Sequence, residues 1–323
     1  MVRPTVPDPS ARGPEPGLRD LPWRAVLLDT VREFRRDNLT SWAAALTYFG
    51  ILALFPALLV LVSVLGLLGS NVTQPLIDNL GELAPGQARD VATGAIESVQ
   101  QNQGASGAAL VIGLLLALWS ASGYVAAFMP AANVVWDVEE GRPAWKRLPL
   151  RVAVTAVLLV LLAVTGVSVV VTGPVARAVG DTIGLGDQAV LVWDVAKWPV
   201  LLVLVSLMIA LLYWATPNVR QPGFRFITPG SVAAVLIWVA ASLAFTVYVA
   251  NFASYNRTYG TFGGIIVFLV WLWISNIAIL FGAELNAELE RARQIRAGLR
   301  PTDTEPYLPP RDEPTERGAP RTA

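Results

Sequence analysis

Six long runs of apolar residues dominate the sequence. They cover about residues 42–68, 106–129, 152–173, 190–215, 230–250 and 262–286. An α-helix needs about 20 mainly apolar residues to cross the hydrocarbon core of a bilayer, which is about 30 Å thick. Only 15% of the 323 residues are charged, against roughly 25% in a soluble domain, so too little polar surface remains to cover six such helices in water. The sequence therefore predicts an all-α, polytopic membrane protein with six transmembrane helices.

Positive charges lie mostly on one side of the predicted membrane. Of the 24 Lys and Arg residues, 20 fall in the N-terminal segment, in the loops after the second and fourth runs, and in the C-terminal tail. Only Arg89, Arg177 and Arg257 fall in the opposite loops. Because cytoplasmic loops carry the excess of Lys and Arg, both termini are predicted to be cytoplasmic. No cleavable signal peptide is expected, since the first residues contain no apolar stretch.

The sequence divides into four parts by composition. We predict a disordered segment over residues 1–21, an amphipathic interfacial helix over 22–41, the transmembrane domain over 42–290 and a mostly disordered tail over 291–323. Apolar residues recur at helical spacing between the arginines of 22–41, as is typical of a helix in the lipid headgroup layer. A helix packed on the protein's own cytoplasmic face fits the same pattern, so the sequence leaves both arrangements open.

Composition excludes most familiar catalytic chemistry. The chain has no His and no Cys, which removes imidazole bases, thiol nucleophiles and most zinc and iron sites. Its 24 cations balance 24 anions, so no net charge would attract nucleic acid. We therefore expect no catalytic residues, no bound metal, no cofactor and no nucleic-acid partner, and the chain is predicted not to be an enzyme.

One group of carboxylates lies in the loop after the second run. Asp137, Glu139 and Glu140 stand close to Arg142 in the sequence. Carboxylate oxygens of this kind bind divalent cations in other proteins. The neighbouring arginine favours salt bridges instead, and salt bridging is the interpretation we prefer here.

Charged residues within the apolar runs are few. Asp194 and Lys197 are three residues apart on the fourth run, so they can face each other, and they are predicted to form a structural ion pair rather than a substrate site. Glu284 lies about ten residues from the midpoint of the sixth run, near the cytoplasmic edge, where an ionised carboxylate costs little. Since no carboxylate lies at mid-depth, the sequence does not indicate a proton relay through the membrane.

Uncharged polar residues in and near the runs are the candidates for a substrate pathway. Small and hydroxyl residues most often mark close helix packing, and the lining of a cavity is the alternative. Ser275 and Asn276, in the sixth run, present the same choice, and Pro56 predicts either a packing kink or a hinge in the first. If the chain transports a solute, the predicted pathway residues are Tyr48, Phe55, Pro56, Trp119, Ser120, Ser122, Asn251, Tyr255 and Asn256.

Several short segments stand out in order over about residues 23–295. They read AALTYFGILALFP (44–56), LWSAS (118–122), EGRP (140–143), TPG (228–230), YVANFASYNRTYG (248–260) and GAELNAELE (282–290). In these segments the chain resembles the YihY/BrkB family of bacterial inner-membrane proteins. The resemblance implies a multi-pass protein of the bacterial plasma (inner) membrane, with six helices and cytoplasmic termini. Family members are often labelled as virulence factors or as a tRNA-processing ribonuclease, and no established biochemical activity comes with the resemblance.

Three functions are compatible with these features. A transporter or flippase of an amphipathic or lipid-like substrate is the leading hypothesis, because the spans lack deep charge yet offer aromatic, hydroxyl and amide groups. A non-transporting scaffold or envelope-assembly protein is the alternative, suggested by the amphipathic N-terminal segment and the charged tails. A membrane-bound ribonuclease is least favoured, because no His and no basic groove accompany the carboxylates. The expected partners are membrane lipids and an amphipathic small molecule, and the sequence indicates no oligomeric state.

Overall fold

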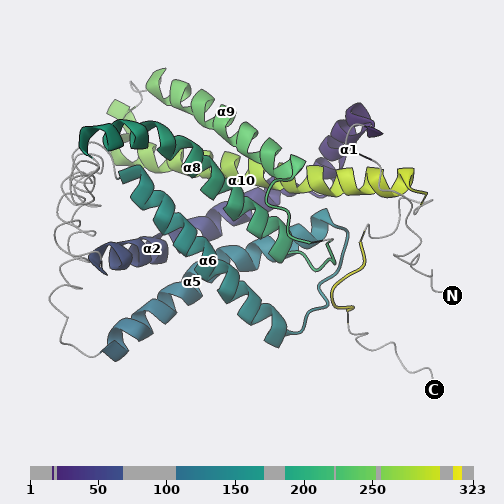
Figure 1. Ribbon diagram of the computed structural model, residues 1–323, viewed down its shortest axis with the longest axis horizontal. Coiled ribbons are helices and arrows are strands. Elements are labelled where there is room, and N and C mark those ends of the chain that lie inside the picture. Colours follow the sequence, from purple (N-terminus) through teal and green to yellow (C-terminus); the bar gives the residue numbers. More distant parts are fainter. Residues whose placement is uncertain are drawn as a thin grey trace. The chain divides into compact units, whose positions relative to one another are not determined.

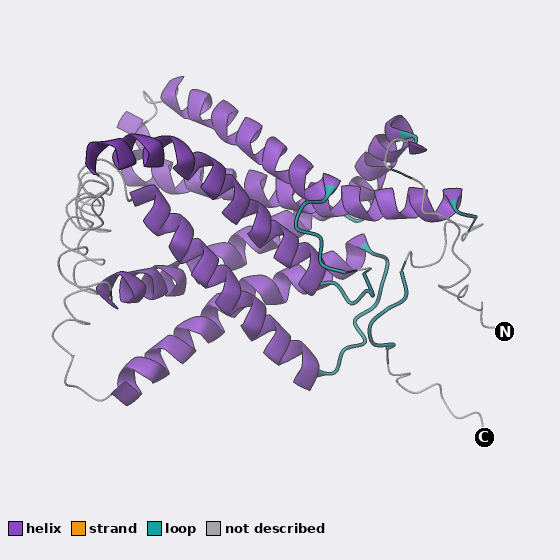
Figure 2. Cartoon of the chain, in the orientation of Figure 1, coloured by secondary structure: helices purple, strands orange, loops and turns teal. Residues whose placement is uncertain are grey.

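The computed structural model describes residues 17, 20–67, 107–170, 186–221, 223–251, 256–298 and 308–314. Every regular element in these ranges is an α-helix, and the described residues contain no strand beyond an isolated β-bridge between Val219 and Pro310 (Figure 2). The all-α prediction is therefore confirmed. In chain order the helices are α1 (Trp23–Arg36), α2 (Leu39–Leu67), α5 (Gly107–Val135), α6 (Ala144–Val170), α8 (Gly186–Ala215), α9 (Pro229–Asn251) and α10 (Asn256–Arg296) (Figure 1).

Among the described residues, four helices contain a stretch long and apolar enough to cross a membrane. These stretches are Ala144–Gly166 in α6, Val195–Ala215 in α8, Pro229–Tyr248 in α9 and Gly264–Arg296 in α10. They correspond to the third to sixth predicted runs. The first two runs coincide with α2 and α5, whose side chains are described only in part, and within α2 a shorter apolar stretch covers Leu39–Leu54. The count of six spans and the cytoplasmic position of both termini stay predictions.

The outward faces of the candidate spans are apolar. Val160 on α6 is 61% exposed, Val203 on α8 is 50% exposed and Leu243 on α9 is 64% exposed. Each candidate span buries only 17 to 22% of its most apolar window inside the protein. Helices that satisfy their own backbone hydrogen bonds and present apolar side chains outward are the form that lipid requires.

The chain divides into two compact units, and the division falls inside α2, α5, α6 and α8. Unit 1 comprises residues 1–48, 125–150 and 209–323, and unit 2 comprises residues 49–124 and 151–208. Unit 1 therefore holds α1, α9 and α10 together with one end of each of the four divided helices. Unit 2 holds the remainder of those four.

Within unit 1, α9 lies along α10 (Figure 1). The backbones come closest at Gly230 and Gly282, where a Cβ added to either glycine would overlap the carbonyl oxygen of the other. Farther along, Trp238 of α9 donates its indole N–H to Ser275 Oγ at 3.1 Å, and Trp271 of α10 donates to Ser242 Oγ at 3.1 Å. Ser275 therefore serves close helix packing, one of the two interpretations that the sequence left open.

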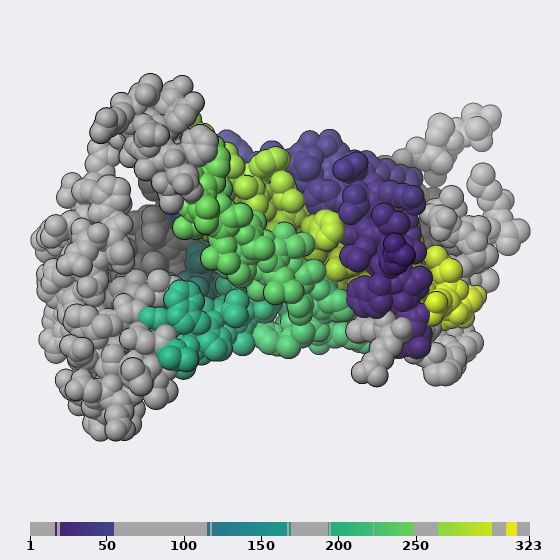
Figure 3. Space-filling view, turned by 90° about the horizontal axis from the view of Figure 1, so that it is seen from above, coloured from purple at the N-terminus to yellow at the C-terminus, as the bar shows by residue number. Residues whose placement is uncertain are grey.

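The amino-terminal helices cover another face of α10. Phe34 of α1 and Phe281 of α10 have ring centroids 5.8 Å apart, and Figure 3 shows the N-terminal residues lying against α10. On α2, Thr47 Oγ1 accepts a hydrogen bond from the side-chain amide of Asn276 at 3.1 Å. Asn276 is 1% exposed, so this polar pair is fully enclosed and also belongs to the packing.

The predicted interfacial helix over 22–41 comprises α1 and the first residues of α2. Asn38, at the junction between the two helices, has a positive φ of 52°, a left-handed conformation that Asn tolerates better than most residues. One side of α1 is buried at Val26, Thr30 and Phe34. The four predicted domain boundaries are not tested by these contacts and stay predictions.

Gly282→Ala is expected to destabilise unit 1 by about 1–3 kcal/mol, because the added methyl group overlaps backbone of α9. The matched control is Gly264→Ala on the same helix, where an added Cβ meets nothing within 4 Å, so the control keeps or raises stability. Thermal unfolding of both variants in one detergent measures the difference. Equal midpoints would show that the close approach of α9 and α10 is not what stabilises this pair.

Candidate functional site

The predicted pathway residues are only partly within the described structure. Tyr48 is 61% exposed and Trp119 is 53% exposed, whereas Ser122 is fully buried; Ser120 is exposed. The first of these belongs to unit 1 and the other three to unit 2. The side chains of Phe55, Pro56, Asn251, Tyr255 and Asn256 lie outside the described residues. The nine residues as a pathway therefore stay a prediction.

Within unit 2, Trp119 and Ser122 share a partner that the sequence did not suggest. Arg151 of α6 donates from Nε to Ser122 Oγ at 2.7 Å, and its guanidinium lies over the Trp119 ring at 5.1 Å from the centroid. Ser122 in turn donates to the carbonyl of Trp119 at 2.6 Å. These contacts tie α5 to α6, so at Ser122 packing accounts for the polar group.

The predicted ion pair on α8 is not tested. The Asp194 side chain lies outside the described residues. Lys197 Nζ lies 5.9 Å from the centroid of the Trp198 ring, a cation–π contact that fits the end of a span. The pairing of Asp194 with Lys197 stays a prediction.

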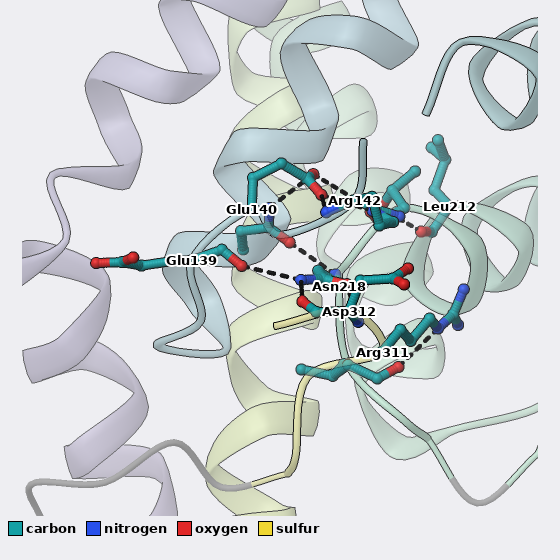
Figure 4. A network of polar contacts seen from close by, with 10 residues as sticks. Glu139, Glu140, Arg142, Leu212, Asn218, Arg311 and Asp312 are labelled. Carbon is teal, nitrogen blue, oxygen red and sulfur yellow. Dashed lines mark hydrogen bonds and ion pairs between the residues drawn. The ribbon is translucent and has the colours of Figure 1, made fainter. Parts of the chain in front are cut away.

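The loops of unit 1 are joined by a polar network around Arg142 (Figure 4). Arg142 donates from Nε to Glu140 Oε1 at 2.8 Å and from Nη2 to Glu140 Oε2 at 2.6 Å. Its Nη2 also donates to the carbonyl of Thr216 at 2.7 Å, across 74 residues of sequence. The predicted salt bridging in this loop is thereby confirmed, with Arg142 only 6% exposed.

Asn218 connects this network to the C-terminal segment 308–314. Its backbone N–H donates to Asn133 Oδ1 at 2.7 Å. Its side-chain amide donates to the carbonyls of Glu139 at 2.9 Å and Asp312 at 2.8 Å. Arg311, the residue before Asp312, donates from Nη2 to the carbonyl of Trp214 at 2.7 Å. Within the predicted tail 291–323, at least these residues are held by specific contacts, and the prediction for the tail as a whole is not tested.

Charge and hydrogen bonding together set the ionisation of Glu140. Burial by itself would raise the pKa of this carboxyl. The hydrogen bonds and positive charge of Arg142, with a further hydrogen bond from Asn133, outweigh burial and hold the pKa of Glu140 below its usual value. The network is therefore ionised and intact at neutral pH.

A cavity of about 170 Å³ lies beside this network in unit 1. Its walls come from α5, α8, the first residue of α9, α10, the loop between α8 and α9, and the C-terminal segment. The apolar lining comprises Phe128, Ala132, Trp136, Ala210, Trp214, Gly223, Ile227, Pro229, Ala283, Leu289 and Leu308. The polar and charged lining comprises Tyr213, Gln221, Arg225, Thr228, Asn286, Glu290 and Arg293.

Most uncharged polar side chains that line the cavity already form hydrogen bonds within the protein. Asn286 donates to Thr228 Oγ1 at 2.9 Å and accepts from the Gly230 N–H at 2.9 Å. Gln221 donates to the carbonyl of Tyr213 at 2.8 Å. These bonds hold the shape of the cavity and leave the charged residues to meet a ligand.

The two arginines at the cavity differ in their surroundings. Arg293 Nη1 lies 3.5 Å from Glu290 Oε2 on the same helix. Arg225 is exposed and forms no hydrogen bond or ion pair with the described residues. The cavity is thus lined by aromatic and aliphatic side chains together with two guanidinium groups, one of them paired with the Glu290 carboxylate. This combination suits a ligand with an apolar and an anionic part.

Sequence reasoning did not identify this cavity. Two of the segments that carry the family resemblance, 228–230 and 282–290, supply Thr228, Ala283, Asn286 and Glu290 to its lining. Those two segments could have indicated part of the cavity lining. No periodicity or spacing in the sequence indicated that they line one cavity together with Trp136 and Leu308. Their conjunction depends on the packing of α10 and the loops.

Comparison with known proteins gives one family. The sequence model of a family described as "Virulence factor BrkB" matches residues 30–305. The "Putative ribonuclease-like protein YfkH" of Bacillus subtilis is 32% identical over 260 residues, which are 79% of this chain and 91% of that protein. No solved structure matches the chain.

Two further relatives are described only as membrane proteins. A UPF0761 membrane protein of Aromatoleum aromaticum is 31% identical over 266 residues, which are 79% of this chain and 62% of that protein. Another, of Alkalilimnicola ehrlichii, is 29% identical over 291 residues, which are 84% of this chain and 60% of that protein. The chain thus spans about three fifths of the length of these two relatives.

Asn218→Ala is expected to lower the stability of unit 1 by about 1–3 kcal/mol, since it leaves the partly buried carbonyls of Glu139 and Asp312 without this donor. Glu313→Ala, an exposed position on the same C-terminal segment, is the control and leaves stability unchanged. Thermal unfolding in detergent compares the two. An Asn218→Ala variant as stable as the control would contradict a stabilising role for the network.

The lowered pKa of Glu140 predicts a loss of stability in acid. The unfolded chain binds a proton at Glu140 at a higher pH than the native protein does. The stabilisation is therefore present above about pH 4.5 and is lost as the pH falls further, through the native pKa. Glu140→Gln should flatten this part of the profile, measured as unfolding midpoint against pH, and an unchanged acid limb in the variant would assign the loss to another group.

Proposed function

From the premise that the chain is an integral membrane protein of the BrkB/UPF0761 family, we propose that it is a transporter or flippase of an amphipathic or lipid-like substrate. The observation that carries the proposal is the cavity in unit 1, which combines aromatic walls with two guanidinium groups. Membership of the family rests on a sequence match over most of the chain. By itself it says nothing about the activity of this protein.

The size of the cavity indicates which part of a substrate it holds. Pockets that enclose a drug-sized ligand have about 300–1,000 Å³, and this one has about 170 Å³. It therefore accommodates a headgroup rather than a whole lipid. Acyl chains would lie outside, along outward apolar residues such as Leu243, where contact with lipid tails costs nothing.

The rest of the proposal concerns topology and partners. Six spans, cytoplasmic termini and a place in the bacterial inner membrane are supported by the apolar runs and by the distribution of Lys and Arg. On that orientation the cavity opens on the cytoplasmic side, and the nine pathway residues of the sequence analysis are proposed to lie along the substrate route. Membrane lipids and an amphipathic small molecule are the proposed partners, with no nucleic acid.

A non-transporting scaffold is the second candidate, and one observation favours it. Besides its buried residues, α1 exposes several large apolar side chains: Trp23, Leu27, Leu28 and Val31. Such side chains suit either the lipid headgroup layer or a protein partner. A scaffold would be recovered with one stoichiometric protein partner after crosslinking, and its deletion would change no solute or lipid distribution.

We further propose that the chain is not an enzyme. The name of the relative YfkH refers to a ribonuclease-like protein, but this chain has no His or Cys to activate water. In the part of the chain that the structure describes, no group of three or more carboxylates is placed to hold a metal ion. Hydrolysis of tRNA by the purified protein would overturn this proposal.

Reconstituted vesicles test the transport proposal. Fluorescent anionic phospholipids are expected to cross the bilayer faster in proteoliposomes than in protein-free vesicles. Arg225→Gln with Arg293→Gln should raise the half-saturating lipid concentration about tenfold or more, since each charge-assisted bond contributes about 1.5–3 kcal/mol.

The matched control for this experiment is Arg296→Gln, which removes an arginine from the same helix outside the cavity. It should transport like the parent protein. If no member of a broad panel of anionic, zwitterionic and neutral amphiphiles moves faster than in empty vesicles, the transport proposal is wrong.

A further inference from the structure

A cluster of carboxylates surrounds Arg291 in unit 1, where α10 meets α1 and the loop after α5. Arg291 Nη1 lies 3.4 Å from Glu288 Oε1 and 3.9 Å from Glu33 Oε1. Its Nη2 lies 3.4 Å from Asp137 Oδ2. Arg36 of α1 also pairs with Glu33, at 3.3 Å. Both guanidinium groups of the cluster are therefore already paired with these three acidic residues.

Glu284 lies one helical turn before Glu288 on α10 and is buried inside this cluster. Its side chain is 1% exposed, and its Oε2 has no hydrogen-bond partner among the described residues. The sequence predicted a position near the membrane edge, where an ionised carboxylate costs little. The expected low cost is wrong because the side chain is enclosed by protein, and the position near the membrane edge stays a prediction. The negative charges that act on it come from Asp37, Glu288, Glu33 and Asp137.

The cluster has more negative than positive charge. Five carboxylates face two guanidinium groups, and neither Glu284 nor Asp37 forms an ion pair with a described cation. A buried carboxylate without a partner costs several kcal/mol if it stays ionised. Since no group of described carboxylates is arranged to hold a metal ion, the cation that fits is a proton, which needs only one oxygen.

Asp37 offers a route for that proton. It stands between α1 and α2 and is only partly buried. Burial raises the pKa of Asp37 to about 6, helped by the charges of Asp137 and Glu33 and opposed by Arg36 and Arg291. A carboxyl that exchanges protons with water close to neutral pH is thus close enough to act electrostatically on the enclosed Glu284.

We propose that Glu284 is a proton-binding site, loaded from the cytoplasmic water through Asp37. Binding forms an O–H bond at the Glu284 carboxylate and removes one negative charge from the cluster, with no electron transfer. The charged groups that face the site are Glu33 and Arg36 from α1, Asp37 from the α1–α2 junction, Asp137 from the loop, and Glu288 and Arg291 from α10.

Proton binding at this place gives a means of coupling. This step rests on the proposed function. Protonation of Glu284 weakens the electrostatic repulsion between α1 and α10. Helix α10 also lines the proposed substrate cavity. A proton gradient would then bias the cavity between two states. This uses a carboxyl at one end of the bundle and needs no relay at mid-depth.

Infrared difference spectroscopy of the reconstituted full-length protein tests the site without any transport measurement. Titration of the ¹³C-glutamate-labelled protein from about pH 10 to about pH 5 is expected to produce the isotope-shifted carbonyl band of a protonated, buried glutamic acid, well above the pH near 4 where free carboxyls titrate. Asp37 titrates in the same range, but the label does not shift its band. Glu284→Gln should abolish the shifted band. Asp29→Asn, on α1 but paired with Arg32 outside the cluster, is the control and leaves the band in place.

Labelling with ¹³C-glutamate assigns the band in the parent protein, so the test stands even if Glu284→Gln does not fold. A band that shifts with the label supports the proposal, and absence of the band, or its survival in Glu284→Gln, overturns it. Lipid flux that responds to a pH gradient in the parent but not in Glu284→Gln would support the coupling. A band without any flux would leave the proton site standing and refute the transport function alone.

Discussion

Lipid cannot hydrogen-bond to a polypeptide backbone, and this constraint shapes the structure described here. Within the candidate spans the backbone is helical and the outward side chains are apolar. The irregular backbone of unit 1 gathers beyond the helix ends, where it has to find its own partners. Arg142 and Asn218 supply many of them, because each joins a loop to a carbonyl or carboxylate far away in the sequence. The network is thus a consequence of confining helices to lipid and loops to water.

Helix α10 brings the functional proposals together, since neighbouring positions on it point to different surroundings. Gly282 allows the close approach of α9, Asn286 and Arg293 line the cavity, and Glu284 lies in the acidic cluster under α1. A helix turns about 100° per residue, so the proposed substrate and proton sites and the packing surface can share about three turns of one helix. Movement of α10 would affect all three.

Sequence reasoning predicted the family, the all-α class and salt bridging between Arg142 and the carboxylates near it, of which the structure selects Glu140. These depend on local features: the length of apolar runs, short ordered motifs, and charges close together in the chain. It did not predict that Arg151 binds Ser122. The sequence analysis used Arg151 only in the count of positive charges that sets the topology, and such a count does not indicate which helix a side chain contacts. The burial of Glu284 was missed for the same reason.

The sequence by itself determined that this chain is a bundle of apolar helices, because hydrophobic length and charge placement are properties of single segments and lipid selects on them directly. Only the tertiary structure decided which polar residues meet. The cavity draws on residues from Phe128 to Leu308, and the cluster draws on Glu33, Asp137 and Glu288. Contacts across such separations follow from how helices pack against one another, and one-dimensional patterns do not encode the partner of a buried side chain.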